Sequence, residues 1–307
     1  MSVDVPRGKT SGRRRFVGGA ASTLALCALV VACGRVQPTP PTAPLIPPTG
    51  GGGPPTYTLA WSDEFDGVAG TLPDPLKWGY DTGDGCPDIC GWGNREKEYY
   101  TRAPENASLN GQGQLAIVAR VAAPGLKCYY GACQYSSAKL TTRGKMSALP
   151  GRVEARIRIP AGQGLWPAFW MLGSNFPTTP WPACGEIDIM ENHGSKPQST
   201  SSAMHGPGYF GGTPFAHDNP IDDSYANDFH VFAVEWDGAR ATFFMDGKAH
   251  YSVLNTDVQR YGAWVFNQSF FVILNLAVGG NFDGDPQSNA ILPATMLVDY
   301  VRVYTRS

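Results

Sequence analysis

The chain has 307 residues, a formal net charge of −2 and a pI near 6.2. This charge balance argues against the strongly basic surface by which proteins bind nucleic acid or an anionic membrane, so we expect neither partner. The 37 glycines and 26 prolines, with only 16% charged residues, are typical of a turn-rich β protein, of a chain with a flexible linker, or of both.

Residues 1–32 have the pattern of an export signal. Arginines at positions 13–15 precede an apolar stretch over residues 18–32, which is shorter than the roughly 20 apolar residues of a membrane span. Paired arginines before Phe16 resemble the twin-arginine type of signal. We therefore expect the protein to be exported.

The end of this signal resembles a bacterial lipobox, Val30-Val31-Ala32-Cys33, in which Cys33 becomes the lipidated first residue of the mature protein. Cleavage near Ala32 without lipidation is the alternative, and it leaves a freely secreted protein. We expect contact with a membrane only through this lipid. Residues 33–56 are rich in Pro, Gly and Thr, cannot build a core, and are predicted to be a semi-extended tether.

Residues 57–307 are predicted to form one all-β domain of short strands. Four segments show the alternation or the β-branched and aromatic content of strands: residues 115–119, 152–159, 240–245 and 298–304. Asp-Gly pairs flank the third segment on both sides and predict consecutive hairpins. Because no long amphipathic helix follows the leader, the pattern favours a sandwich of two sheets or a jelly roll.

Five cysteines lie in this domain. In an oxidising compartment the simplest disulfides are Cys86–Cys90 and Cys128–Cys133, although spacing alone does not determine the connectivity. A zinc site is disfavoured because no matching Cys/His pair follows at a suitable spacing. Cys184 is the odd thiol, and we expect it to be buried and structural.

The most informative segment is residues 186–191, which places three carboxylates in an otherwise apolar run. An unpaired buried carboxylate is costly, so this charge must serve a purpose. Side chains alternate along a strand, so Glu186 and Asp188 share one face while Glu191 points to the other. One extra residue near Ile189-Met190, a β-bulge, returns Glu191 to the face of its partners.

With this bulge, Glu186 and Glu191 are about four strand steps apart, roughly 13 Å between Cα atoms. Two glutamates that lean together close the carboxyl separation to roughly 5 Å, which suits the nucleophile and acid/base of a retaining glycosidase. A solvated acidic surface or a calcium site is the alternative. Trp166, Trp170 and Trp181 favour a sugar site, because rings stack on the C–H faces of sugars, although tryptophans also fill cores.

Further motifs extend across the domain, at residues 92–96, 99–101, 151–156, 164–172, 186–191, 204–206, 229–231, 234–236, 273–280 and 298–304. Together they resemble glycoside hydrolase family 16, specifically its laminarinase-like endo-β-1,3-glucanase branch. This resemblance implies a β-jelly-roll whose concave sheet forms the substrate cleft. It also implies retaining cleavage of internal β-1,3-glucosidic bonds of laminarin-like β-glucans by double displacement, with no cofactor in catalysis.

We expect Glu186 to be the nucleophile and Glu191 the general acid/base, with Asp188 between them as a hydrogen-bond partner of the nucleophile. Three close carboxylates cannot all ionise without repulsion, so at least one pKa must rise, and the acid needs that raised pKa. The spacing E-x-D-x-x-E resembles the laminarinase branch of the family, whereas the lichenase branch has E-x-D-x-E.

The resemblance and the nearby aromatic residues also predict substrate contacts. The candidates are Asn94, Arg95, Glu154, Arg156, Trp166, Trp170, Trp181, His205 and Asn275. For Glu154 and Arg156 the alternation by itself indicates a solvated strand face, and only the resemblance places them in the cleft. A lone histidine such as His205 is more often an ordinary hydrogen-bonded residue, and an Asn near a Gly-Gly pair more often serves a turn.

Members of this family carry a structural calcium on the convex side, and Glu64 and Asp299 are the matching positions, since calcium requires hard oxygen ligands. Surface acids are also common without calcium. Two alternatives for the function stay open: the same chemistry on mixed-linkage glucan, galactan or agar, and a non-catalytic carbohydrate-binding protein. A lectin, however, needs neither Glu186 nor Glu191. We expect the protein to act as a monomer.

Overall fold

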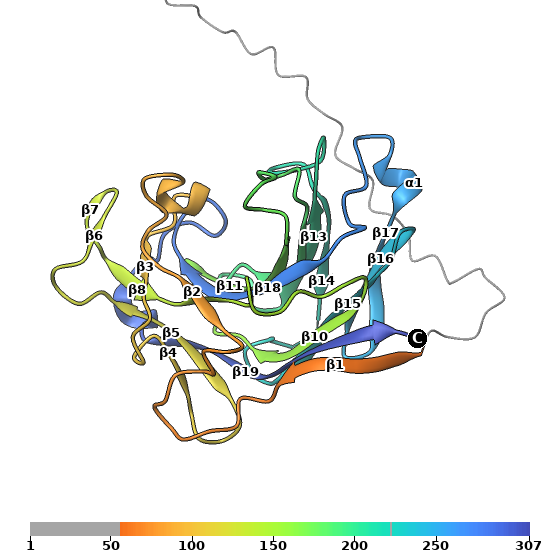
Figure 1. The fold of residues 1–307 in the computed structure, drawn as a ribbon. Coiled ribbons are helices and arrows are strands. Elements are labelled where there is room, and N and C mark those ends of the chain that lie inside the picture. The colour runs from red at the N-terminus through yellow and green to blue at the C-terminus, as the bar shows by residue number, and fades with distance from the viewer. Residues whose placement is uncertain (1–55, 222) are drawn as a thin grey trace, which may run out of the picture. The chain divides into compact units, whose positions relative to one another are not determined.

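The computed structural model describes residues 56–221 and 223–307. The predicted export signal, Cys33 and all but the last residue of the predicted tether lie outside these ranges and stay predictions. Two mainly antiparallel sheets pack face to face in the described part, which confirms the predicted β-jelly-roll sandwich (Figure 1). Among the described residues, no helix is long and apolar enough to cross a membrane.

The larger sheet has ten strands. Its main path is, in spatial order, β17 (Lys248–Leu254), β16 (Arg240–Met245), β15 (His230–Trp236), β10 (Gly151–Arg158), β19 (Ala294–Arg306), β5 (Leu115–Val121), β8 (Tyr135–Ser137) and β3 (Glu98–Tyr100). Two further strands join it at its side: β1 (Tyr57–Asp63) pairs with β19, and β4 (Ala107–Leu109) pairs with β5.

The smaller sheet has seven strands. Their spatial order is β14 (Phe215–Pro220), β13 (Ser199–His205), β12 (Glu186–Asn192), β11 (Leu165–Gly173), β18 (Phe270–Val278), β9 (Lys139–Thr141) and β2 (Gly79–Asp81). The remaining described elements are the ribbon β6 (Lys127–Cys128) with β7 (Gly131–Ala132), the 3-10 turns η1 (Cys90–Gly93) and η2 (Asn289–Ile291), and the short helix α1 (Asn255–Val258).

The four predicted strands are confirmed as β5, β10, β16 and part of β19. In β10 the apolar residues Val153, Ala155 and Ile157 are fully buried, because every second side chain enters the space between the sheets. The predicted hairpin between β16 and β17 turns at Asp246 and Gly247, which have φ values of 49° and 76°. Positive φ at both central residues is the requirement of a type I′ turn.

The core lies between the two sheets, and β18 is the longest fully buried strand of the described residues. All nine residues of β18 are buried. The strand lies between β11 and β9, and a small apolar cluster of Leu172, Cys184, Phe271 and Ile273 covers part of its other face. Cys184 is a free, fully buried cysteine, as expected.

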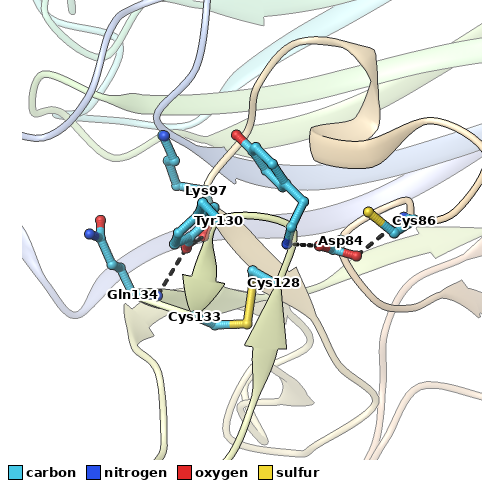
Figure 2. Close-up of a disulfide and its surroundings, with 8 residues drawn as sticks. Asp84, Cys86, Lys97, Cys128, Tyr130, Cys133 and Gln134 are labelled. Carbon is cyan, nitrogen blue, oxygen red and sulfur yellow. Dashed lines mark hydrogen bonds between the residues drawn. A yellow bond between two sulfur atoms is a disulfide. The ribbon is translucent and has the colours of Figure 1, made fainter. Parts of the chain in front are cut away.

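Both predicted disulfides are present, Cys86–Cys90 and Cys128–Cys133, and Figure 2 shows the second of them. The buried carboxylate of Asp84 links the two disulfide-bonded loops, because it accepts the backbone N–H of Cys86 at 3.2 Å and that of Tyr129 at 2.5 Å. Together these contacts anchor the chain that precedes β3.

Candidate active site

The predicted bulge is present in β12. Asp188 pairs with Ala203 and Glu191 pairs with Ser201, so three steps along β12 match two steps along β13. The extra residue lets three apolar side chains of this short segment enter the core: Ile187, Ile189 and Met190. As a result, all three carboxylates face the other side of the seven-stranded sheet, away from the core.

Two of these carboxylates meet a histidine from the neighbouring strand. His205 of β13 pairs directly with Glu186 of β12, so their side chains share one face of the sheet. Nε2 of His205 lies 3.1 Å from Oδ2 of Asp188 and 3.8 Å from Oε1 of Glu186. One nitrogen or oxygen atom from each of the three side chains lies within 4.8 Å of the others.

Each glutamate also has an indole beside it. Trp166 of β11 donates its indole N–H to Oε1 of Glu191 at 3.0 Å. At the other end of the motif, Trp181 is close enough to Glu186 to lower the pKa of its carboxyl group. The Trp181 side chain is 39% exposed, and its ring centroid lies 6.1 Å from that of His205. Trp166 and Trp181 therefore flank the acidic cluster.

Burial raises the pKa of all three carboxyl groups. Desolvation is the largest cause in each case: it raises the pKa of Glu186 to about 8, that of Asp188 to about 8, and that of Glu191 well above 4.5. Repulsion from Asp188 adds to the rise at both glutamates, whereas attraction to His205 opposes it. The three carboxyl groups interact closely, so their titration belongs to the cluster as a whole and not to any one residue.

These raised pKa values predict that the acidic cluster destabilises the folded domain at alkaline pH. Between the ordinary pKa of 4.5 and the raised value of about 8, folded Glu186 binds its proton more tightly than the unfolded chain, so stability falls as pH rises through this window. A Glu186→Gln variant cannot acquire the charge. We expect it to match the wild type near pH 4 and to be more stable near pH 9 by on the order of 2–4 kcal/mol.

Urea unfolding at both pH values measures this difference in the free energy of unfolding. The exposed Glu105 provides a matched control, because Glu105→Gln removes the same charge from a solvated position. Equal stabilities of Glu186→Gln and the wild type near pH 9 would show that burial does not disfavour the ionised form of Glu186.

Predicted residues from two other strands lie beside the cluster. The indole N–H of Trp170 in β11 donates to Oδ1 of Asn275 in β18 at 2.7 Å. The Asn275 amide in turn donates to the hydroxyl of Tyr100 at 3.1 Å. These bonds connect β11, β18 and β3 on the cleft side, and they hold Trp170 and Asn275 in fixed orientations.

Lys139 of β9 is a site residue that the sequence analysis missed. The side chain is buried, and its Nζ lies 4.9 Å from the ring centroid of Trp170 and 4.4 Å from that of Trp92. Its charge also lowers the pKa of Glu186. A cation next to the apolar Ala138 and Leu140 was the available signal, because a buried lysine requires partners.

The loop with Asn94 and Arg95 lies over the β18 end of the site. The Asn94 amide donates to Oε1 of Glu96 at 3.1 Å, and its backbone carbonyl accepts the N–H of Asn281 at 2.7 Å. Arg95 is exposed and has a φ of 60°. Asn94 therefore holds the loop in place, and direct contact of Asn94 and Arg95 with substrate stays a prediction.

The expectation that Glu154 and Arg156 line the cleft is wrong. Both lie on β10 of the ten-stranded sheet, with their side chains on the face opposite to the core. Glu154 forms an ion pair with Arg152 at 2.8 Å, and Arg156 forms one with Asp299 at 2.8 Å. The physical reason is that alternation shows which residues share a face but not which sheet carries the cleft.

A structural calcium at Glu64 and Asp299 stays a prediction. Both oxygens of Glu64 accept from Arg302, at 3.0 and 2.8 Å, and Asp299 pairs with Arg156.

A family model described as glycosyl hydrolases family 16 matches residues 96–302, which include the whole acidic cluster. The chain belongs to this family. A beta-glucanase of Rhodothermus marinus is 42% identical over 263 residues, covering 81% of this chain and 86% of that protein. Glucan endo-1,3-beta-glucosidase A1 of Niallia circulans is 40% identical over 265 residues, covering 80% of this chain but 37% of that longer protein.

Solved structures of similar proteins have the same fold as this family 16 domain. The laminarinase catalytic domain of Thermotoga maritima is 40% identical and superposes with a TM-score of 0.76, covering 81% of this chain and 98% of that one. Family 16 catalysis needs no cofactor, because the two carboxyl groups perform the chemistry.

The family 16 site contains two aromatic residues that the sequence analysis did not single out. Phe210 is 43% exposed and lies edge-on to Trp181, with ring centroids 5.3 Å apart. Phe282 stacks on Trp166 with centroids 4.3 Å apart. Both come from glycine-containing loops, where local pattern gives no indication of their neighbours.

Proposed function

We propose that this domain is a retaining endo-β-1,3-glucanase that cleaves internal bonds of laminarin-like β-glucans by double displacement. The observation that carries the proposal is the register shift in β12, which gathers Glu186, Asp188 and Glu191 on one face. Trp166 and Trp181 beside the two glutamates provide rings for sugar stacking, and Trp166 also donates its indole N–H to Glu191.

In the first step, a carboxylate oxygen of Glu186 forms a bond to the anomeric carbon of the sugar. The bond from that carbon to the glycosidic oxygen breaks, and Glu191 gives its proton to the departing oxygen. The products are a glycosyl ester on Glu186 and a shortened glucan with a free hydroxyl. The raised pKa of Glu191 supports this role, because the acid must still be protonated when substrate binds.

In the second step, the Glu191 carboxylate takes a proton from a water molecule, whose oxygen attacks the same anomeric carbon. The ester bond breaks and Glu186 leaves as a carboxylate. One water is consumed, Glu191 is protonated again, and two inversions retain the configuration. Asp188 lies between the two glutamates on the same face, and we expect it to share a proton with Glu186 as the charge on the nucleophile changes during this cycle.

The substrate assignment is supported by the names of the similar proteins, a glucan endo-1,3-beta-glucosidase and a laminarinase. A more distant relative, 30% identical, is a keratan-sulfate endo-1,4-beta-galactosidase. The same two carboxyl groups can therefore serve different glycans, and the residues around them determine which chain binds.

Release of reducing ends from laminarin, lichenan, agarose and galactan tests the assignment. We expect laminarin to be cleaved fastest, and we expect a ladder of oligosaccharides early in the reaction, because an endo enzyme cuts internal bonds. Faster cleavage of agarose or galactan would overturn the substrate assignment but leave the chemistry. No cleavage of any of the four glycans would favour a carbohydrate-binding protein instead.

A further inference from the structure

The loop that follows β18 is tied to the active site by one buried carboxylate. Oδ2 of Asp283 accepts the backbone N–H of Gly164 at 2.8 Å and that of Ser195 at 2.9 Å. Oδ1 of Asp283 accepts the Ser195 hydroxyl, and the side chain of Asp283 is only 5% exposed. Because Gly164 precedes β11 and Ser195 follows β12, this carboxylate joins the segments on either side of the catalytic strands.

The contact between these loops is too close for larger side chains. Gly164 has a φ of +87°, and a Cβ there would lie 2.4 Å from the backbone nitrogen of Pro286. A left-handed conformation and a backbone approach of this kind both require glycine. The Asp283 loop is therefore docked closely on the turn that leads into β11.

The residue before Asp283 is held between two rings. Phe282 stacks on Trp166 with centroids 4.3 Å apart and an interplanar angle of 15°. It stacks on His193 with centroids 3.7 Å apart and an angle of 4°. Since Trp166 donates its indole N–H to Glu191 at 3.0 Å, contacts run without a break from Asp283 to the proposed general acid/base.

We propose that Asp283 and Phe282 are positioning residues for Glu191: the Asp283 carboxylate fixes the loop, Phe282 fixes the plane of Trp166, and the indole N–H is thereby kept on the Glu191 carboxyl. The proposal rests on the role given to Glu191 above. An N–H donor stabilises the ionised form of a carboxyl more than the neutral form, so this contact opposes the rise in the pKa of Glu191 that burial causes.

Other titratable groups near both carboxyls must be considered in a pH experiment. Glu191 faces Asp188 and Glu186 of its own strand and His205 of β13. Asp283 faces His193, whose Nδ1 lies 3.7 Å from Oδ1. Burial lowers the pKa of His193. The charge of Lys196 lowers this pKa further, whereas the charge of Asp218 raises it.

The pH dependence of kcat/KM on laminarin tests the proposal with three single variants, one double variant and one control. Trp166→Phe removes the N–H donor that stabilises ionised Glu191, so the pKa of Glu191 should rise. We therefore expect the alkaline limb of the kcat/KM profile to move up by about one pH unit, because a hydrogen bond to a charged group is lost. Asp283→Asn should move the limb in the same direction by an equal or smaller amount. The double variant should show no larger shift than Trp166→Phe alone, since both changes act on one hydrogen bond.

Asp285→Asn is the matched control, because it removes the same charge from the same loop at an exposed position whose nearest cation, Lys97, lies 4.0 Å away. It should leave the alkaline limb unchanged. If Asp283→Asn destabilises the domain, Phe282→Leu tests the same route by removing the stack while leaving the carboxylate contacts. We expect Phe282→Leu to shift the limb as Asp283→Asn does.

An independent readout separates this proposal from the proposed function. In ¹⁵N-labelled wild type, the indole N–H resonance of Trp166 should follow the titration of Glu191, and this dependence should weaken in Asp283→Asn whether or not laminarin is cleaved. Additive shifts of the alkaline limb in the double variant, or an indole titration unchanged in Asp283→Asn, would overturn the positioning role. A wild type that cleaves no glucan would overturn the proposed function alone.

Discussion

Glu186→Gln is expected to reduce laminarin hydrolysis by on the order of 10⁴-fold or more, because the amide cannot form the glycosyl ester on which the first step depends. Glucan binding should persist, since the indoles of Trp166 and Trp181 and the shape of the sheet are unchanged. Initial rates of reducing-end release and binding of the variant to laminarin, measured by calorimetry, check the two parts of this expectation.

Glu154→Gln is a matched control for this experiment. It makes the same substitution at a buried glutamate, but on the outer face of the ten-stranded sheet, where the carboxylate bonds to Arg152 and Tyr304. We expect activity close to that of the wild type at a temperature where both variants are folded. Hydrolysis by Glu186→Gln at the wild-type rate would remove Glu186 from the nucleophile role.

Glu191→Ala is expected to lower the rate on laminarin by about 10²–10⁴-fold, the range of general acid catalysis. The loss should be much smaller on an aryl glycoside whose leaving group needs no proton, because the first step then proceeds without the acid. The space left by the side chain should also admit azide, which needs no base to attack the glycosyl ester. Rates on both substrates, with and without azide, check these expectations.

The comparison of the two glutamate variants separates their roles. Azide should accelerate Glu191→Ala on the aryl glycoside and yield a glycosyl azide of retained configuration, whereas it should not restore Glu186→Gln through an ester that cannot form. Azide rescue of Glu186→Gln with a product of retained configuration, and rescue of Glu191→Ala only with an inverted product, would exchange the two assignments.

Much of the catalytic strand could be predicted from its local sequence. Three carboxylates and three apolar residues share the short segment that follows Gly185, and simple alternation cannot satisfy both groups. One extra residue solves the conflict, and β12 contains it: Ile189 and Met190 both enter the core while Glu191 returns to the face of Glu186. The local disulfides were predictable for a similar reason, since short spacing limits the partners of each cysteine.

The neighbours of these residues could not be predicted from local sequence. Lys139, Phe210 and Asp283 reach the site from segments distant in the chain, and only the order of strands in the seven-stranded sheet brings them together. Their surroundings in the sequence are ordinary strand and turn residues. A contact between distant segments leaves no periodic signal in either one.

What the sequence by itself determined is which side chains share a face, because the period of a strand and the need to bury apolar residues are local properties. Only the tertiary structure determined which of these faces lines the substrate cleft. Glu154 and Arg156 show the difference: their alternation indicated a solvated strand face and only the resemblance placed them in the cleft, whereas β10 lies in the opposite sheet and pairs these charges with Arg152 and Asp299. The position of β10 in that sheet depends on pairing with strands distant in the chain, and local periodicity does not encode such pairing.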